Sequence, residues 1–358
     1  MMKNKKLNLI LATLLPLQWL LMQFLSTKPS FIESYYSLGL YPIIARFFRI
    51  TFGWIPFSLG DIFYIIIGFI IIKSIIRIIK TRKIKLLRIV ANISIIYFCF
   101  HLFWGLNYFR EPLQKSLQIS SVDYTTDELE DFTYQLINKV NHLQIIITHN
   151  DTLKVELPHT KKELYTKVEN GYSDLSQVYP QFKYKSASIK NSVISLPLTY
   201  MGFSGYLNPF TGEGQVNSLN PMVSYPITSC HEVAHQLGYA AENEANFIGF
   251  LSAINNEDVY FQYSGYYMAL RYALNDLYGH DKEKYKIAFN NINKGIVKNM
   301  HESYEFWNSY QNPFEVYFKQ IFNQFLKVNK QPEGIKSYNK MVGMLINFNQ
   351  QHLFLESN

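Results

Sequence analysis

The chain has 358 residues, of which 48% are hydrophobic and 17% are charged, and this composition excludes a disordered chain, a collagen and a coiled coil. The net charge of +7 is uneven, because residues 1–110 carry fourteen Lys and Arg against two acidic residues, whereas residues 111–358 carry twenty against twenty-five. The larger part is therefore acidic, which argues against nucleic acid as a partner, and two cysteines exclude a disulfide framework.

Three apolar segments within residues 1–110 are long enough to cross a membrane. They cover about residues 7–25, 62–79 and 86–106, and one crossing needs roughly 20 apolar residues. The first segment is longer than the apolar core of a signal peptide and lacks a small-residue cleavage site, so we interpret it as an anchor. The sequence therefore predicts a transmembrane region with three spans, in contact with the lipid bilayer.

The distribution of basic residues predicts how these spans are oriented. Four of the six residues in 80–85, between the second and third spans, are Lys or Arg, whereas the much longer loop before the second span has only three. The positive-inside rule places the N-terminus and residues 80–85 in the cytoplasm, so residues 111–358 lie outside it. In a diderm bacterium that is the periplasm. This orientation requires that residues 31–56 do not cross the membrane. Pro42 and Gly53 interrupt that apolar stretch, so we interpret it as an interfacial or re-entrant segment.

Residues 111–358 have mostly helical periodicity with one β-prone stretch. Thr126, followed by acidic residues, is typical of a helix start, and Thr160 with Glu163 fits a capping box. Between residues 186 and 226, glycines and prolines separate short β-prone pieces, and residues 208–212 are typical of a turn between two strands. We expect a mainly α, zincin-like domain with a small β element before its most informative helix.

That helix carries the sequence His-Glu-Val-Ala-His at residues 231–235. His231 and His235 lie about 40° apart around a helix, so both imidazoles can reach one ion. A catalytic Zn²⁺ takes three protein ligands and keeps its fourth position for water, and Glu232 is placed beside that water as the catalytic general base. Gly238 can end the helix in a left-handed conformation. The sequence therefore predicts a zinc centre.

A third metal ligand is available in residues 242–246. Glu242 shares one helix face with small residues such as Gly249, which would let another helix approach closely. Glu244 lies about 200° away around the helix. We therefore choose Glu242 as the third ligand and keep Glu244 as the alternative. Asn246, one turn after Glu242, can accept a hydrogen bond from a ligand imidazole.

Two further roles have candidates in the sequence. A transition-state oxyanion needs a donor besides the metal, and Tyr338 and Tyr206 are candidate donors. Residues 200–203 precede the motif helix and could align a peptide substrate as an added strand. A packed hairpin is the alternative for that segment.

The motif and the residues after it resemble a known class of enzymes. Glu242, Ala245 and Asn246 after the 231–235 motif resemble the Glu-x-x-Ala-Asp helix of gluzincin metallopeptidases, with Asn246 in the place of Asp. Over nearly its full length the chain is similar to the uncharacterised bacterial membrane family called domain of unknown function 3810. The resemblance implies a zinc-peptidase-like ectodomain and gives no substrate. The segments of this chain that carry the resemblance to that family are residues 104–108, 209–211, 215–217, 231–238, 242–247, 317–328 and 334–338.

These observations together predict a zinc metallopeptidase of the bacterial cytoplasmic (inner) membrane, which hydrolyses peptide bonds of peptides or envelope proteins. The alternative is a non-catalytic envelope scaffold or sensor with a structural zinc site, in which four protein ligands would close the metal. A transporter or channel subunit is a third possible class of function. The three spans argue against it, because His101 is their one candidate for a functional polar residue within the membrane. The sequence defines neither the substrate nor the oligomeric state.

Overall fold

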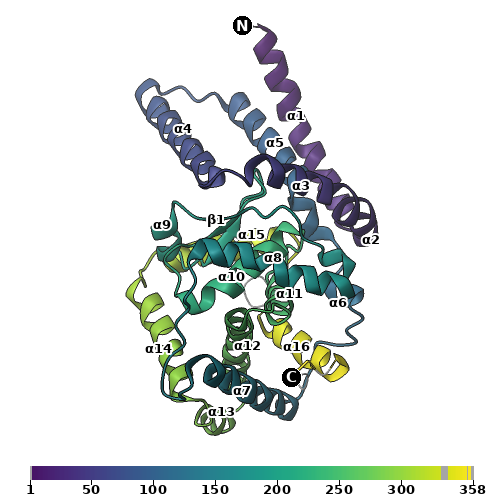
Figure 1. Ribbon diagram of the computed structural model, residues 1–358. Helices are drawn as coiled ribbons and strands as arrows, with labels where there is room; N and C mark the ends of the chain where they lie inside the picture. The colour runs from purple at the N-terminus through teal and green to yellow at the C-terminus, as the bar shows by residue number, and fades with distance from the viewer. Residues whose placement is uncertain (1, 332–337, 353, 356–358) are drawn as a thin grey trace.

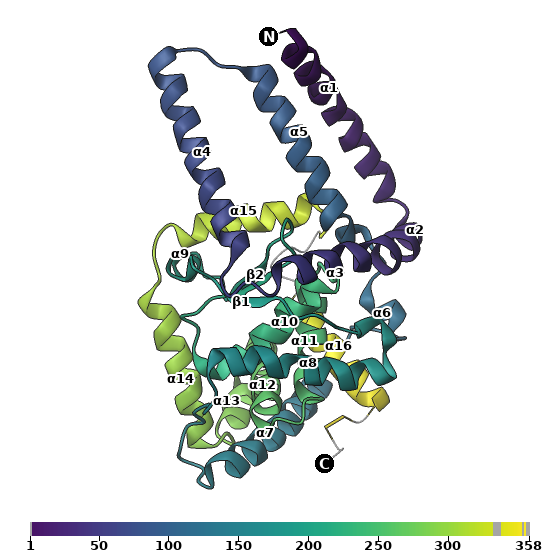
Figure 2. The ribbon, with the colours of Figure 1, turned by 45° about the horizontal axis from the view of Figure 1, so that its top comes forward.

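The computed structural model describes residues 2–331, 338–352 and 354–355, and these are mainly helical (Figure 1). Within the described residues, three helices are long and apolar enough to cross a membrane. They are α1 (Met2–Leu25), α4 (Leu59–Thr81) and α5 (Leu86–Phe103). All three project from the same side of a helical domain, so the protein is membrane-anchored (Figure 2). The three predicted segments are confirmed, but α5 ends before residue 106 because a 3₁₀ turn, η2 (Gly105–Phe109), begins there.

The interrupted segment after α1 is a run of helix that crosses the base of the long helices. It comprises α2 (Pro29–Phe31), a π-helix η1 (Ile32–Leu40) and α3 (Tyr41–Phe52). Its side chains at Ile32, Tyr36, Tyr41, Ala45 and Arg49 are buried, and their spacing places them on one face. The opposite face is apolar and exposed, and none of these three helices is a candidate span. One face therefore packs on the protein and the other is apolar and exposed, and the predicted interfacial placement of this segment stays a prediction.

The helical domain is built around α10, α11 and α12, which pack against one another at its centre (Figure 1). Fully buried aromatic side chains, including Phe247, Phe250 and Tyr263, fill this core. The domain helices are α6 (Leu113–Ser116), α7 (Thr126–Thr148), α8 (Lys161–Val178), η3 (Pro180–Phe182), α9 (Ser195–Tyr200), η4 (Met222–Ser224), α10 (Tyr225–Gln236), α11 (Glu242–Ile254), α12 (Val259–His280), α13 (Lys282–Phe289), α14 (Lys294–Ser309), α15 (Glu315–Val328) and α16 (Tyr338–His352).

Capping boxes start α7 and α8. In α8 the pair is Thr160 and Glu163, as predicted. In α7 the capping residue is Thr125, one position before the predicted Thr126, because the Thr125 hydroxyl accepts a hydrogen bond from the Glu128 amide and the Glu128 carboxylate accepts one from the Thr125 amide. Both caps satisfy amides that a helix start leaves without partners.

A three-stranded sheet lies between the long helices and α10. Its order is β1 (Ile189–Asn191), β3 (Gly214–Val216), β2 (Gly205–Leu207), with β1 parallel and β2 antiparallel to β3. The predicted turn at residues 208–212 joins β2 to β3 and is confirmed. The predicted strand at residues 200–203 is wrong, because Tyr200 ends α9 and a turn follows it. Both β1 and β2 are edge strands of this sheet, and all three residues of β2 line a cavity.

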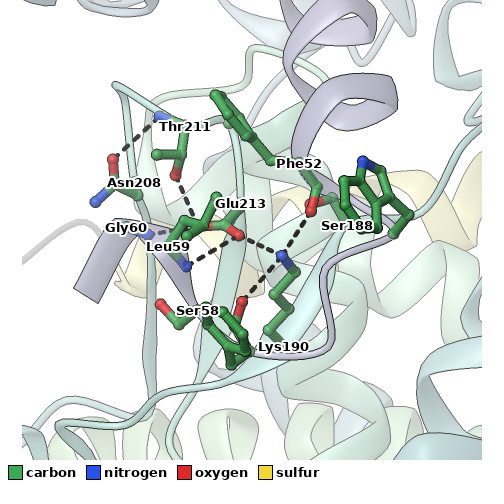
Figure 3. Close-up of polar contacts among 12 residues, drawn as sticks. Phe52, Ser58, Leu59, Gly60, Ser188, Lys190, Asn208, Thr211 and Glu213 are labelled. Atoms are coloured by element: carbon green, nitrogen blue, oxygen red, sulfur yellow. Dashed lines mark hydrogen bonds and ion pairs between the residues drawn. The ribbon is translucent and has the colours of Figure 1, made fainter. Parts of the chain in front are cut away.

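A buried ion pair between Lys190 and Glu213 ties this sheet to the start of α4 (Figure 3). The Glu213 carboxylate also accepts hydrogen bonds from the amides of Leu59 and Gly60, at 3.3 and 2.6 Å, in the first turn of α4. A negative charge is favourable there because the amides at a helix N-terminus point at it. Lys190 donates in addition to the carbonyl of Phe52, at 2.7 Å, at the end of α3. The pair therefore holds two membrane-proximal elements on the sheet.

We expect Lys190→Ala to destabilise the protein by about 3–5 kcal/mol, because it leaves the buried Glu213 carboxylate without its cation. The measurement is thermal unfolding of the full-length chain in detergent. The control is Lys154→Ala, which removes an ion pair to Glu302 whose side chains are 37% and 51% exposed, and it should cost less than about 1 kcal/mol. Equal melting temperatures for the two variants would contradict the structural role of Lys190.

Candidate metal centre

The motif helix α10 and the following helix α11 pack unusually closely. Gly238, with φ of +90°, reverses the chain after α10, as predicted. On α11, a Cβ atom added to Gly249 would lie 3.0 Å from the backbone nitrogen of His231. The small-residue face of α11 is therefore turned toward the start of the motif, as its helical phase predicts.

This packing brings His231, His235 and Glu242 together. One ligand atom from each lies within 4.8 Å of the others, and the carboxylate oxygens of Glu242 lie 3.4 Å from Nε2 of His231 and 3.7 Å from Nε2 of His235. Nδ1 of His235 donates a hydrogen bond of 2.7 Å to the carbonyl oxygen of Tyr239, so Nε2 presents its lone pair to the group. Two imidazoles and a carboxylate are the donor set of a three-ligand zinc site.

The pKa shifts of His235 and Glu242 favour the protonation states that bind a metal, whereas the shift of His231 favours the protonated imidazole, which would release its proton on binding one. Burial, together with the charge of His231, lowers the pKa of His235 to about 4. Burial would raise the pKa of Glu242, but the hydrogen bond from His231 and the charges of both histidines outweigh it, so the pKa is lowered. Burial would lower the pKa of His231, but Glu242 and Glu232 outweigh it and raise this pKa. A neutral His235 and an ionised Glu242 are both competent ligands.

Glu232 lies beside the three ligands and is not one of the group. Its side chain is buried, and its Oε2 atom has no hydrogen-bond partner. Burial raises the pKa of Glu232 to about 8, with the nearby His231 charge opposing the shift and the Glu242 charge adding to it. Strand β2 packs against the Glu232 side chain so closely that a Cβ atom added to Gly205 would lie 2.5 Å from Oε1 of Glu232. The carboxyl group is thus held between α10 and β2.

The structure separates Glu244 from this group. The Glu244 carboxylate accepts a hydrogen bond of 2.7 Å from the amide of Leu113, the first residue of α6. Burial raises the pKa of Glu244 to about 6. Glu244 therefore satisfies the start of a neighbouring helix, and Glu242 occupies the position of the third candidate ligand. Asn246 lines the same cavity as the group and contributes to the raised pKa of His231, but Nδ1 of His231 has no hydrogen-bond partner.

One of the two predicted oxyanion donors, Tyr206, is engaged by another side chain. The Tyr206 ring lines the cavity, but its hydroxyl donates to the Asp61 carboxylate at the start of α4. The side chain of Tyr338 lies outside the described residues. Tyr108 and Tyr272, which the sequence analysis missed, also line the cavity, and the charge of Glu242 adds to the burial that raises their pKa values. Tyr108 belongs to the 104–108 segment of the family resemblance, but no sequence pattern marks either tyrosine as a hydrogen-bond donor to a substrate.

Donors from the membrane-proximal segments satisfy the C-terminal end of α10. The Tyr41 hydroxyl donates to the Gln236 carbonyl at 3.1 Å, and Nε1 of Trp104 donates to the His235 carbonyl at 3.3 Å. Arg110 donates to the Gly238 carbonyl at 2.9 Å, and its guanidinium lies 3.9 Å from the centre of the Tyr239 ring. A positive charge is favourable at this end of a helix. The motif helix is therefore fixed to segments that adjoin the long apolar helices in the chain.

The comparisons with known proteins give one match. The family model described as "Protein of unknown function (DUF3810)" matches residues 36–346, which include the second and third apolar helices, the sheet and the whole candidate metal centre. The comparisons with curated proteins and with solved structures give no match. Since the matched segment covers most of the chain, the protein belongs to the DUF3810 family.

Proposed function

We propose that the protein is a membrane-anchored zinc metallopeptidase with a gluzincin-type, zincin-like domain. The observation that carries the proposal is the convergence of His231, His235 and Glu242 within 4.8 Å, with the buried Glu232 carboxyl beside them in the wall of one cavity. The experiment that tests it is cleavage of a mixed peptide library by the purified full-length chain, which Glu232→Gln should abolish.

The proposed chemistry divides between the metal and Glu232. His231, His235 and Glu242 would hold the zinc, which when bound polarises a peptide carbonyl and lowers the pKa of water. Glu232 accepts a proton from the attacking water and passes it to the leaving nitrogen, as a general base and then a general acid. Its unpartnered Oε2 atom is available for that proton. Tyr108 and Tyr272 replace Tyr206 as the candidate donors to the developing oxyanion.

The open edge of β2 supports a peptide as the substrate. Asn208 and Ser204, on either side of β2, hydrogen bond toward β3. In an antiparallel pair such bonds alternate, so the backbone groups of Gly205 and Leu207 point toward the open edge. An extended peptide can pair with these groups as an added strand. Because Gly205 abuts Glu232, this peptide would pass directly beside the proposed base.

The rival function is a scaffold or sensor in which zinc only joins two helices. Such a structural site has four protein ligands, whereas the group found in the described residues has three. Three protein ligands would leave the fourth position of a bound zinc for water, which favours the peptidase.

We further propose that the helical domain lies outside the cytoplasm of a bacterial cell, anchored in the inner membrane. The N-terminal end of α1 and the basic loop between α4 and α5 lie together at the end farthest from the domain (Figure 2). The positive-inside rule places that end in the cytoplasm. Envelope proteins and peptides would then be the accessible substrates.

Alkaline phosphatase fused after Asn358 should therefore be active, because this reporter folds only outside the cytoplasm. The matched control is green fluorescent protein fused at the same position. If the C-terminus is exported through the same pathway, this fusion should remain non-fluorescent. Enzyme activity and fluorescence of intact cells are compared at equal expression. A bright fluorescent fusion with a silent phosphatase fusion would reverse the proposed orientation.

A further inference from the structure

One cavity of about 1500 Å³ links the candidate metal centre to the membrane-spanning helices. Its lining includes His231 and Glu242 at the metal centre, Tyr64 of α4, and Ile96 and Phe100 of α5. Ordinary ligand pockets measure roughly 300–1,000 Å³. The size and lining of this cavity therefore fit a substrate that extends from the site to the spans.

Both α4 and α5 contribute side chains to the lining of the cavity. Helices α1 and α5 pack along each other, whereas α4 stands apart from both (Figure 2). No residue in the most apolar window of α4 is buried, and side chains such as Phe69 and Ile72 are exposed. Because both α4 and α5 contribute to the cavity lining, a chain within the bilayer can reach the cavity sideways, between these two helices.

Helix α15 closes the domain side of this opening. It crosses below α4 and α5 in Figure 2, and Phe325 contacts Phe100 of α5, with ring centres 6.0 Å apart. Phe322 and Phe325 line the cavity. The apolar side chains of Tyr317, Ile321 and Val328 are exposed on the same helix. An amphipathic helix with this composition lies at a membrane surface, so α15 places the cavity entrance at the level of the lipid.

Strand β2 connects the entrance to the metal centre. All three of its residues line the cavity, and Tyr206 stacks on Tyr64 of α4 with ring centres 5.9 Å apart. The start of α4 is fixed to the sheet by Asp61, which accepts hydrogen bonds from Ser192 and from the amide of Val193. A polypeptide that enters beside α4 therefore meets the open edge of β2 and, after it, Glu232.

We propose that the substrate is a protein anchored by a transmembrane helix, which enters from the lipid between α4 and α5 and is cut a few residues outside its anchor. This inference rests on the proposed peptidase function and adds the class of substrate and its route. An unanchored peptide has a different route, through the end of the cavity where His301 and Tyr304 are exposed.

The test compares two forms of one cleavable peptide, chosen from the library that the full-length chain cuts. One form is free, and the other is joined to a Leu-Ala transmembrane helix in the same phosphatidylcholine–phosphatidylglycerol vesicles as the full-length chain. We expect Ile96→Trp, which fills the entrance from α5, to slow cleavage of the anchored form at least about tenfold and to change cleavage of the free form less than about twofold.

The matched control is Ile95→Trp, because Ile95 and Ile96 are 45% and 50% exposed on the same helix but only Ile96 lines the cavity. Ile95→Trp should leave both rates unchanged, and both variants should retain zinc. Equal slowing of the two forms by Ile96→Trp, or no slowing of either, would overturn entry from the lipid while the peptidase function stands. If the wild-type chain cuts the free form but not the anchored form, entry from the lipid is also overturned. If it cuts no peptide of the library, the peptidase function itself fails, and this inference fails with it.

Discussion

Glu232→Gln is expected to abolish peptide hydrolysis while one zinc ion stays bound. Gln has nearly the shape of Glu but cannot accept the proton of the attacking water, and a positioned general base contributes about 10²–10⁴-fold to a rate. Glu232 stands outside the group of candidate ligands, so the change removes no ligand atom. The measurements are initial cleavage rates of library peptides, followed by mass spectrometry, and the zinc content of the full-length chain by elemental analysis.

The control for this variant is Glu305→Gln, which changes a carboxylate whose side chain is 56% exposed on α14. It should match the wild-type chain in both rate and zinc content. If the wild-type chain cleaves peptides and Glu232→Gln cleaves them equally fast, Glu232 is not the base. If the wild-type chain binds zinc and cleaves nothing, the zinc-joined scaffold replaces the peptidase.

Zinc content is expected to fall from about one ion per chain to background in His235→Ala, because a site with three protein ligands loses one of them. Glu242→Gln should also bind zinc much more weakly, because an amide oxygen is a poorer ligand than a carboxylate. The matched control is Glu244→Gln on the same helix. Its amide oxygen can still accept the hydrogen bond from Leu113, so zinc should be retained.

Elemental analysis after dialysis against a weak chelator measures all three variants, and thermal unfolding confirms that each is folded. Zinc loss in Glu244→Gln together with retention in Glu242→Gln would assign the third ligand to Glu244. Full retention in His235→Ala would show that the motif does not hold the metal. These outcomes depend on ligand geometry alone and are independent of any substrate.

Structural features that depend on residues close together in the chain could be predicted from the sequence. The three apolar helices follow from runs of apolar residues, and the Thr160 capping box follows from a three-residue spacing. The preference for Glu242 over Glu244 rests on helical phase, and α11 does turn Glu242 toward the histidines. The error of one residue at Thr125 and the wrong strand at residues 200–203 both concern element boundaries, where neighbouring residues offer equally good local patterns.

The apolar helices, the His-Glu-x-x-His motif and the helix face that carries Glu242 follow from local sequence, because each depends on residues close together along the chain. The folded chain was needed to show that Tyr206 donates to Asp61, that Trp104 and Arg110 satisfy the end of α10, and that the cavity reaches α4 and α5. These contacts join residues more than one hundred positions apart. No local period encodes such pairings, because they arise from how separate helices pack against one another.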